Sequence, residues 1–294
     1  MRRSGPCTWG RRVSDRRHAG EGVGTPEGAV TEPPRRVLVP IGETRLSVLE
    51  AGRGQPLVFV HGAVTTSDLF RRTVEHFAPR YRAIAVDLPG YGDSDKRGSG
   101  YNIRQFSADL ARLFDRLALE PAVLLGVSMG GFVVQRFALD HPDRLAGLVL
   151  ASTSDGEFAP GVLAADPVAK IREVGWRQFS EALITGAFPP ATAPALVAAL
   201  LERITTWNEQ VITEVAISMR EFDSRPELGR LCLPTLVMVG SEDHQLPVPL
   251  SQRLERLIEG ARLEVFEGAG HFMMVEQPEK FHRVLDEFLV SVWP

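Results

Sequence analysis

Cysteine is scarce in this chain, with only Cys7 and Cys232 among 294 residues. Two cysteines cannot form a disulfide framework, so we expect the protein in a reducing compartment, the cytoplasm. No group of cysteines and histidines has the spacing of metal ligands, and we expect neither a metal nor another cofactor. The sequence therefore excludes the small disulfide-rich folds and gives no sign of a zinc site.

The chain also lacks an excess of positive charge and long apolar runs. The net charge is −4, and it is more negative still without the arginine-rich residues 1–36, which disfavours a nucleic-acid partner. Residues 1–36 contain no apolar stretch long enough for a signal peptide or a membrane span, so no membrane partner is expected. We expect this segment to be a disordered tail, or to precede the true start, because ordered patterning begins only at Val37.

The remaining composition is that of a globular protein, with 44% apolar and 24% charged residues. Strand-like runs occur at 37–41, 44–50, 57–61, 82–86, 122–127, 146–151, 234–239 and 262–266. Amphipathic helical patterns lie mostly between the later runs, which predicts an α/β fold whose mainly parallel, eight-stranded sheet is covered by helices on both faces. Helical patterning replaces the strand rhythm over 153–230. This divides the chain into a core of residues 37–152 plus 231–294 and a helical segment between them.

One serine lies between glycines at the point where a strand-like run meets a helical pattern. The segment is Gly126-Val127-Ser128-Met129-Gly130-Gly131. Strand, sharp turn and helix in this order are typical of a nucleophile elbow, where a strained turn holds the serine hydroxyl clear of the sheet. Such patterns also arise in ordinary turns, so Ser128 gains a chemical role only if a base and an acid accompany it.

His271 is the best candidate for the base among seven histidines. It follows the strand-like run at 262–266 in a loop of small residues, which lets an imidazole approach another backbone closely. Four other histidines are interpreted as solvated or structural because they fall in the tail, in charged helical patterns or before a proline: His18, His76, His282 and His141.

The candidate acid is Asp243, in the loop after the run at 234–239. Loops at the carboxyl ends of parallel strands are where such sheets place their chemistry. Asp155, just after the run at 146–151, is the alternative acid, and Glu242 is interpreted as a solvated neighbour.

A second turn after a buried run completes the set. The run at 57–61 leads into His61-Gly62-Ala63, where an oxyanion-hole loop should follow a third strand. The backbone N–H groups of Ala63 and Met129 would then face the negative charge of a tetrahedral intermediate. We expect His61 to shape this loop rather than to transfer protons.

Together these motifs resemble the α/β-hydrolase-fold serine hydrolases of the cap-bearing, cofactor-independent group. The nucleophile, acid and base follow one another in the order of that fold, which differs from the order in the two best-known protease folds. The resemblance covers about residues 37–152 and 229–294. The matching segments are His61-Gly62, Asp87 to Ser94, Gly126 to Gly131, Gly240 to Asp243 with Pro247, and Gly270 to Phe272 with Glu276-Gln277-Pro278.

This resemblance implies that Ser128, Asp243 and His271 form a catalytic triad that acts through an acyl-enzyme, with residues 153–230 as a cap. It implies a monomer or homodimer that hydrolyses a carboxylic ester or lactone of a small, largely apolar molecule. Carbon–carbon bond hydrolases, cofactor-free haloperoxidases or perhydrolases, and a small-molecule signal receptor with slow hydrolysis remain open as alternatives. Substrate contacts are expected from the active-site loops and the cap: His61, Gly62, Trp176, Phe188, Trp207 and Phe272.

Overall fold

The computed structural model describes residues 32–163, 166–190, 192, 194–202 and 208–293. Eight strands form one sheet in the order β1-β2-β4-β3-β5-β6-β7-β8. The first two strands pair antiparallel, as do β2 and β4, and all later neighbours pair parallel. The strands are β1 (Arg35–Pro40), β2 (Arg45–Ala51), β3 (Pro56–Val60), β4 (Arg82–Val86), β5 (Ala122–Val127), β6 (Leu145–Ala151), β7 (Thr235–Gly240) and β8 (Arg262–Phe266).

Every strand-like run of the sequence is a strand, with ends within two residues of the expected ones. Strands β5 and β7 are buried along their whole length, because both faces of a parallel sheet are covered. The predicted α/β fold with a mainly parallel, eight-stranded sheet is therefore confirmed.

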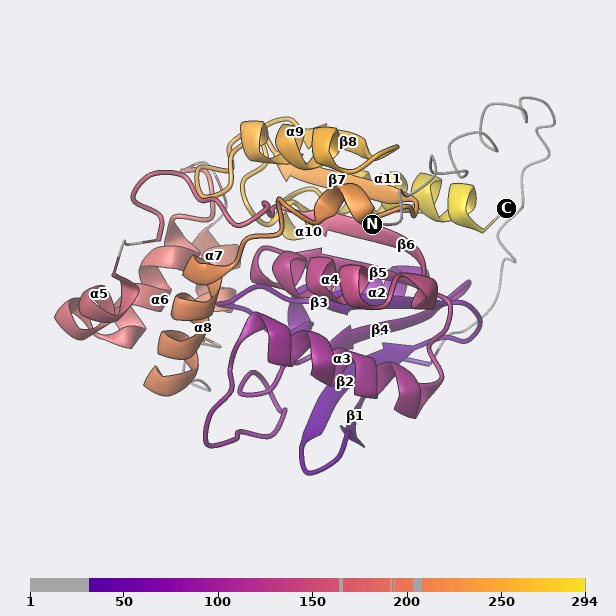
Figure 1. Ribbon diagram of the computed structural model, residues 1–294, viewed down its shortest axis with the longest axis horizontal. Helices are drawn as coiled ribbons and strands as arrows, with labels where there is room; N and C mark the ends of the chain where they lie inside the picture. The colour runs from indigo at the N-terminus through magenta and orange to yellow at the C-terminus, as the bar shows by residue number, and fades with distance from the viewer. Residues whose placement is uncertain (1–31, 164–165, 191, 193, 203–207, 294) are drawn as a thin grey trace.

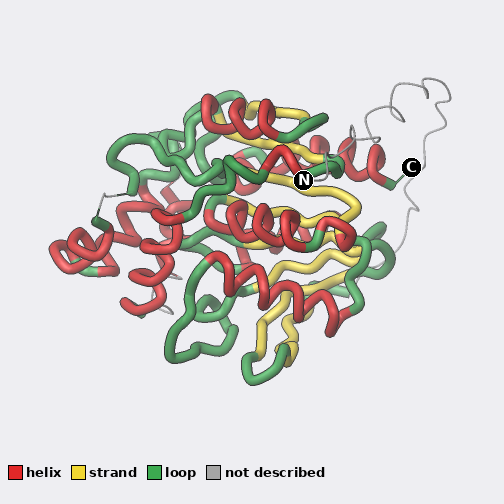
Figure 2. Tube along the Cα trace, viewed as in Figure 1, coloured by secondary structure: helices red, strands yellow, loops and turns green. Residues whose placement is uncertain are grey.

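Helices cover both faces of the sheet (Figure 1, Figure 2). A side chain added at Gly126 of β5 would meet the first turn of α4, whereas one added at Gly147 of β6 would meet Phe288 of α11. Gly147 pairs with Val123 of β5. Successive side chains of a strand alternate between the two faces of the sheet, and Val123 and Gly126 are an odd number of residues apart. The two helices therefore lie on opposite faces. The core helices are α2 (Arg71–Phe77), α3 (Ile103–Leu117), α4 (Met129–Asp140), α9 (Val248–Leu257), α10 (Met273–Glu276) and α11 (Pro278–Val292), with short 3₁₀ turns η1 (Ser67–Phe70), η2 (Pro142–Arg144) and η4 (Leu228–Arg230).

A helical insert separates β6 from β7 in the chain, where the sequence loses its strand rhythm. It contains α5 (Pro167–Val174), α6 (Trp176–Thr185), α7 (Pro194–Leu201) and α8 (Glu209–Glu221). Figure 1 shows these helices gathered beyond one end of the sheet. In the described part of the chain, no helix is both long and apolar enough to cross a membrane.

The expected boundary between tail and core is wrong by two residues. Arg35 and Arg36 belong to β1, and Arg36 is half-buried. A strand prediction based on apolar runs does not include these two residues, because both are charged. Residues 1–31, the rest of the expected tail, lie outside the described residues.

One further expectation does not hold. His282 is buried rather than solvated, because α11 packs against α2 and the His282 ring stacks on His76 with centroids 4.2 Å apart. Cys232, just before β7, is not a free cysteine in the described part of the chain. Cys7 lies outside the described residues.

Candidate active site

Ser128 occupies a strained turn between β5 and α4. Its φ of 56° and ψ of −122° are outside the regions that L-residues ordinarily adopt. Three backbone contacts hold it there: its N–H donates to the Ala151 carbonyl, and its carbonyl accepts from the Gly131 N–H and the Thr153 hydroxyl. Strain of this kind persists only where the surroundings fix it, and it is common at active sites.

The glycines around Ser128 are required by close backbone approaches. A Cβ at Gly126 would lie 2.3 Å from the Gly130 oxygen, and one at Gly130 would lie 2.4 Å from the Val60 oxygen. At Gly131 it would lie 2.3 Å from the Thr153 hydroxyl. The turn therefore tolerates no side chain at these three positions.

Asp243 and His271 are joined by a hydrogen bond at the carboxyl edge of the sheet. His271 Nδ1 lies 2.8 Å from Asp243 Oδ2, and both residues are 2% exposed. The other carboxylate oxygen, Oδ1, accepts from the backbone N–H groups of Gln245 and Leu246 at 3.0 and 2.9 Å. An ionised carboxylate only accepts hydrogen bonds, so Nδ1 carries the proton and Nε2 is the basic nitrogen.

Asp155, the alternative acid, is engaged elsewhere. It is fully buried, and both of its carboxylate oxygens lie 2.5 Å from the guanidinium of Arg253 on α9. This bidentate pair commits Asp155 to Arg253. Glu242 is exposed, as expected for a solvated neighbour of Asp243.

The loop after β3 is held by its own carbonyl. The Gly62 oxygen accepts from the Thr65 N–H at 3.3 Å and lies 2.7 Å from His61 Nδ1. His61 Nε2 accepts from the Leu88 N–H at 3.1 Å, so Nδ1 is protonated and donates to Gly62. Burial lowers the pKa of His61 and favours this neutral form.

Fixing the Gly62 carbonyl also orients the next N–H group. In a planar trans peptide the N–H of Ala63 is directed opposite to the Gly62 carbonyl. The Gly62 backbone lies against Ser128, since a Cβ added to it would be 3.2 Å from Ser128 Cβ. The second expected donor, Met129, is the first residue of α4, where N–H groups have no partner within the helix.

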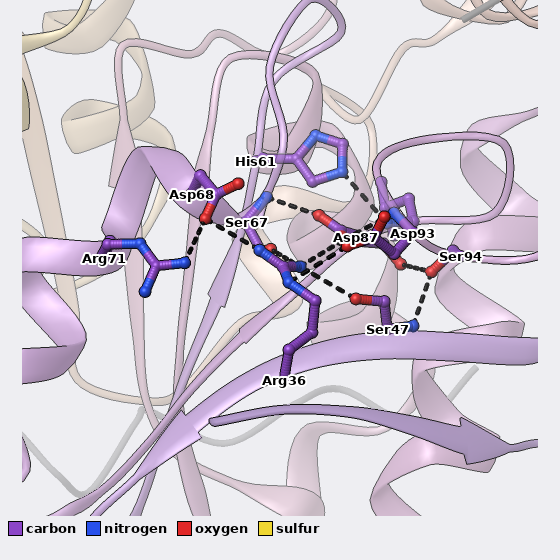
Figure 3. A network of polar contacts seen from close by, with 10 residues as sticks. Arg36, Ser47, His61, Ser67, Asp68, Arg71, Asp87, Asp93 and Ser94 are labelled. Atoms are coloured by element: carbon purple, nitrogen blue, oxygen red, sulfur yellow. Dashed lines mark hydrogen bonds and ion pairs between the residues drawn. The ribbon is translucent and has the colours of Figure 1, made fainter. Parts of the chain in front are cut away.

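A network of polar contacts lies behind this loop (Figure 3). The buried Asp87, at the end of β4, accepts from the Ser67 N–H at 2.7 Å and from Arg36 at 2.8 Å. Arg36 also donates to the Ser47 hydroxyl and to Asp68. It thus joins the first two strands to the segment that follows Ala63.

Sequence reasoning missed the roles of two members of this network. Arg36 falls in the expected tail, and Asp87 appears in the sequence only as the first residue of a matching segment. A signal for Asp87 did exist, because an acid at the carboxyl end of a buried strand needs a partner. Nothing near Arg36 in the sequence points to Asp87.

An apolar cavity opens in front of Ser128 and His271. The insert provides much of its wall: Phe179 and Leu183 of α6, and Ile212, Val215, Ala216 and Met219 of α8. Gln245 is polar but uncharged, and no Lys, Arg, Asp or Glu occurs among the described lining residues. Among the described residues there is also no cluster of three or more His, Cys, Asp or Glu that could hold a metal ion.

Only some of the expected substrate contacts reach this cavity. Gly62, Ala63 and Phe272 line it, whereas His61 is fully buried beneath the loop. Trp176 lies one turn before Phe179, where the guanidinium of Arg177 covers its ring at 4.8 Å. The Phe188 ring packs against that of Phe272, with centroids 5.4 Å apart, and is not among the described residues that line the cavity. Trp207 lies outside the described residues.

Several known proteins resemble this chain in sequence or in fold. A 3-oxoadipate enol-lactonase 2 of Acinetobacter baylyi is 29% identical over 78% of this chain and 86% of its own. A 2-hydroxy-6-oxo-2,4-heptadienoate hydrolase of Pseudomonas putida is 28% identical over 86% of this chain and 96% of its own. A thermophilic esterase of Thermogutta terrifontis superposes with a TM-score of 0.80 at 28% identity, covering 88% of this chain and all of that one.

A family model also matches most of this chain. The model of the alpha/beta hydrolase family matches residues 57–284, from β3 to α11. That range contains the elbow at Ser128, the Asp243 loop and the His271 loop. The protein therefore belongs to the alpha/beta hydrolase family.

Proposed function

We propose that the protein is a serine hydrolase that cleaves carboxylic ester or lactone bonds in small, largely apolar molecules. The hydrogen-bonded pair of Asp243 and His271 carries this proposal, because His271 opens onto the same apolar cavity as the strained Ser128. A serine hydroxyl becomes a good nucleophile when a base accepts its proton and an acid orients that base. Ser128 and His271 both line the cavity, and Asp243 is hydrogen-bonded to His271 from behind.

The reaction would proceed in two steps. His271 Nε2 accepts the hydroxyl proton while Ser128 Oγ attacks the carbonyl carbon, and Asp243 stabilises the resulting imidazolium. The N–H groups of Ala63 and Met129 donate to the oxyanion. The imidazolium then protonates the leaving alcohol, and water activated by His271 releases the acid from Ser128.

The cavity wall favours an uncharged acyl group. A carboxylate on the substrate would lose its hydration among side chains such as Leu183 and Val215, and no Lys or Arg of the described lining could pair with it. Two of the relatives carry the names of carboxylate-bearing molecules, oxoadipate and heptadienoate. This protein differs, because its described cavity lining offers a carboxylate no charged partner. We therefore propose neutral esters or lactones as its substrates.

The insert supports a cap role for residues 153–230. Side chains of α6 and α8 line the cavity together with residues of the sheet loops. We propose that this segment selects the acyl group, since it supplies most of the wall that a substrate would touch.

A substrate panel with a Ser128→Ala control tests the proposal. We expect fast hydrolysis of short neutral aryl esters or lactones, and loss of both turnover and phosphonate labelling in the variant. Turnover of a 1,5-diketone without ester turnover would favour a carbon–carbon bond hydrolase, and peroxide-dependent halogenation would favour a haloperoxidase. Labelling with no turnover above about one per hour, far below ordinary enzyme rates, would favour a receptor.

A further inference from the structure

A second carboxylate lies beneath the loop that carries His271. Glu276 ends α10, and both of its oxygens accept from the Gly270 N–H, at 3.1 and 3.2 Å. Its Oε2 also accepts from the Thr192 hydroxyl at 3.2 Å. Thr192 belongs to the insert, so one carboxylate contacts both the histidine loop and the proposed cap.

The histidine loop is held on its other side as well. The His271 N–H donates to the Ala187 carbonyl of the insert at 2.8 Å. Gly270 fits between these contacts only because it lacks a side chain, since an added Cβ would lie 2.6 Å from the Ala187 oxygen and 3.3 Å from Glu276. Two consecutive N–H groups, of Gly270 and His271, are thus anchored by Glu276 and by the insert.

The charges around His271 come from two elements. Asp243 faces its Nδ1 from the loop after β7, and Glu276 faces its loop from α10, while the insert contributes the uncharged Ala187 and Phe188. Burial raises the pKa of Glu276, and a positive charge on His271 acts in the opposite direction. By reciprocity, an ionised Glu276 stabilises the imidazolium that forms when Ser128 loses its proton.

We propose that Glu276 is a positioning residue for the general base, fixing the His271 loop through Gly270 and tying that loop to the insert through Thr192. The proposal rests on the proposed function, because His271 needs positioning only if it acts as the base. It assigns Glu276 two separable effects. The carboxylate charge stabilises the imidazolium that forms when His271 accepts the Ser128 proton, and the bond to Thr192 keeps the loop and insert in register.

Three variants separate these effects from a purely structural role. Glu276→Gln keeps the shape and removes the charge, and Thr192→Val keeps the charge and removes the tie. Glu267→Gln, an exposed glutamate in the same loop, is the matched charge control. For each variant we would measure kcat and KM on a neutral aryl ester and the pH dependence of phosphonate labelling, and thermal unfolding would verify folding.

We expect Glu276→Gln to lower kcat about tenfold with little change in KM, and to shift the acidic limb of labelling to lower pH. Thr192→Val should lower kcat about threefold without shifting that limb, and Glu267→Gln should behave like the wild type. If Glu276→Gln fails to fold, an unaltered kcat in Thr192→Val overturns the tie. If the phosphonate labels the wild type but Glu276→Gln has the same kcat and the same pH dependence of labelling, the Glu276 proposal alone is overturned. If the phosphonate does not label the wild type, the proposed function is overturned.

Discussion

At the residue scale, the two buried aspartates after β6 and β7 show how a partner decides a role. Asp243 contacts His271, and Asp155 contacts Arg253. Their positions at the ends of neighbouring strands are equivalent in the sequence pattern. Only the three-dimensional partners distinguish an acid that orients a base from one that holds two segments together.

Exchanging each aspartate for asparagine should therefore give opposite results. Asp243→Asn should lower kcat by about 10⁴-fold, because the amide favours the wrong tautomer of His271. Asp155→Asn should retain most of kcat but lower the free energy of unfolding by about 3 kcal/mol, since Arg253 loses its charged partner. Ester kinetics and urea unfolding of both variants measure this, and the reverse pattern would identify Asp155 as the acid.

His61 allows a second test at this scale, because its imidazole acts through the Gly62 carbonyl. His61→Phe keeps the ring against Tyr91 but removes both hydrogen bonds. We expect kcat to fall by about 10- to 100-fold as the Ala63 N–H loses its orientation. His61→Asn, whose amide can still donate to Gly62, should retain more activity than His61→Phe. Equal rates in the two variants would argue against a role through the Gly62 carbonyl.

Most of the site could be read from single residues and their neighbours. Ser128, Asp243 and His271 each follow a buried strand, and loops at that edge of a parallel sheet meet in space. Arg36 could not be found in this way, since its contacts with Ser47 and Asp87 lie 11 and 51 residues away. The substrate contacts expected at Trp176 and Phe188 depend on how α6 and the segment after it lie against the rest of the molecule, which no local pattern encodes.

At the scale of elements, α2 and α11 come from distant parts of the chain and bury a histidine between them. His282 Nε2 lies 3.2 Å from the Thr73 hydroxyl, 209 residues away. The charged residues around His282 predicted an exposed helix face, and only the packing of α11 on α2 reveals the burial. Strand positions were easier to predict, because β3 to β7 are apolar runs with clear ends.

This contact should make stability depend on pH. Burial lowers the pKa of His282 from 6.5 to about 4, so between these values the unfolded chain binds a proton that the folded protein does not. Stability should therefore fall as pH decreases from about 6.5 to about 4. His282→Gln should show a smaller loss of urea midpoint between pH 7 and pH 5 than the wild type. His244→Gln, an exposed control with 71% of its side chain accessible, should match the wild type. Equal losses in all three proteins would contradict the assignment to His282.

At the scale of the whole molecule, the cavity lies where two parts of the chain meet. The sheet loops supply Ser128 and His271, and the insert supplies apolar side chains of α6 and α8. Under the proposed function, the reacting groups and the selecting side chains therefore come from different segments. A charge placed on the insert should then change the preferred substrate without altering the reacting groups.

Val215→Arg on α8 tests this division. The new guanidinium could pair with a substrate carboxylate in the cavity. We expect the kcat/KM ratio of a dicarboxylic acid monoester to a neutral ester of equal length to rise about tenfold. Ile217→Arg, on the exposed side of α8 with 36% accessibility, is the matched control. A similar rise in the control would assign the effect to surface charge rather than to the cavity wall.

The position of the insert in the chain has a consequence for how this protein could diversify. The insert leaves the sheet after β6 and returns at β7, and these strands are adjacent, with Ala151 paired to Met238. Such an excursion can lengthen, shorten or be replaced wholesale while the strands beneath it keep their pairing. The contacts between the insert and the His271 loop limit this freedom. A replacement segment must still offer a carbonyl where Ala187 accepts from His271 and a hydroxyl where Thr192 donates to Glu276. Under the proposed function, changes in the insert during evolution would alter the acyl preference, while Ser128, Asp243 and His271 stay unchanged.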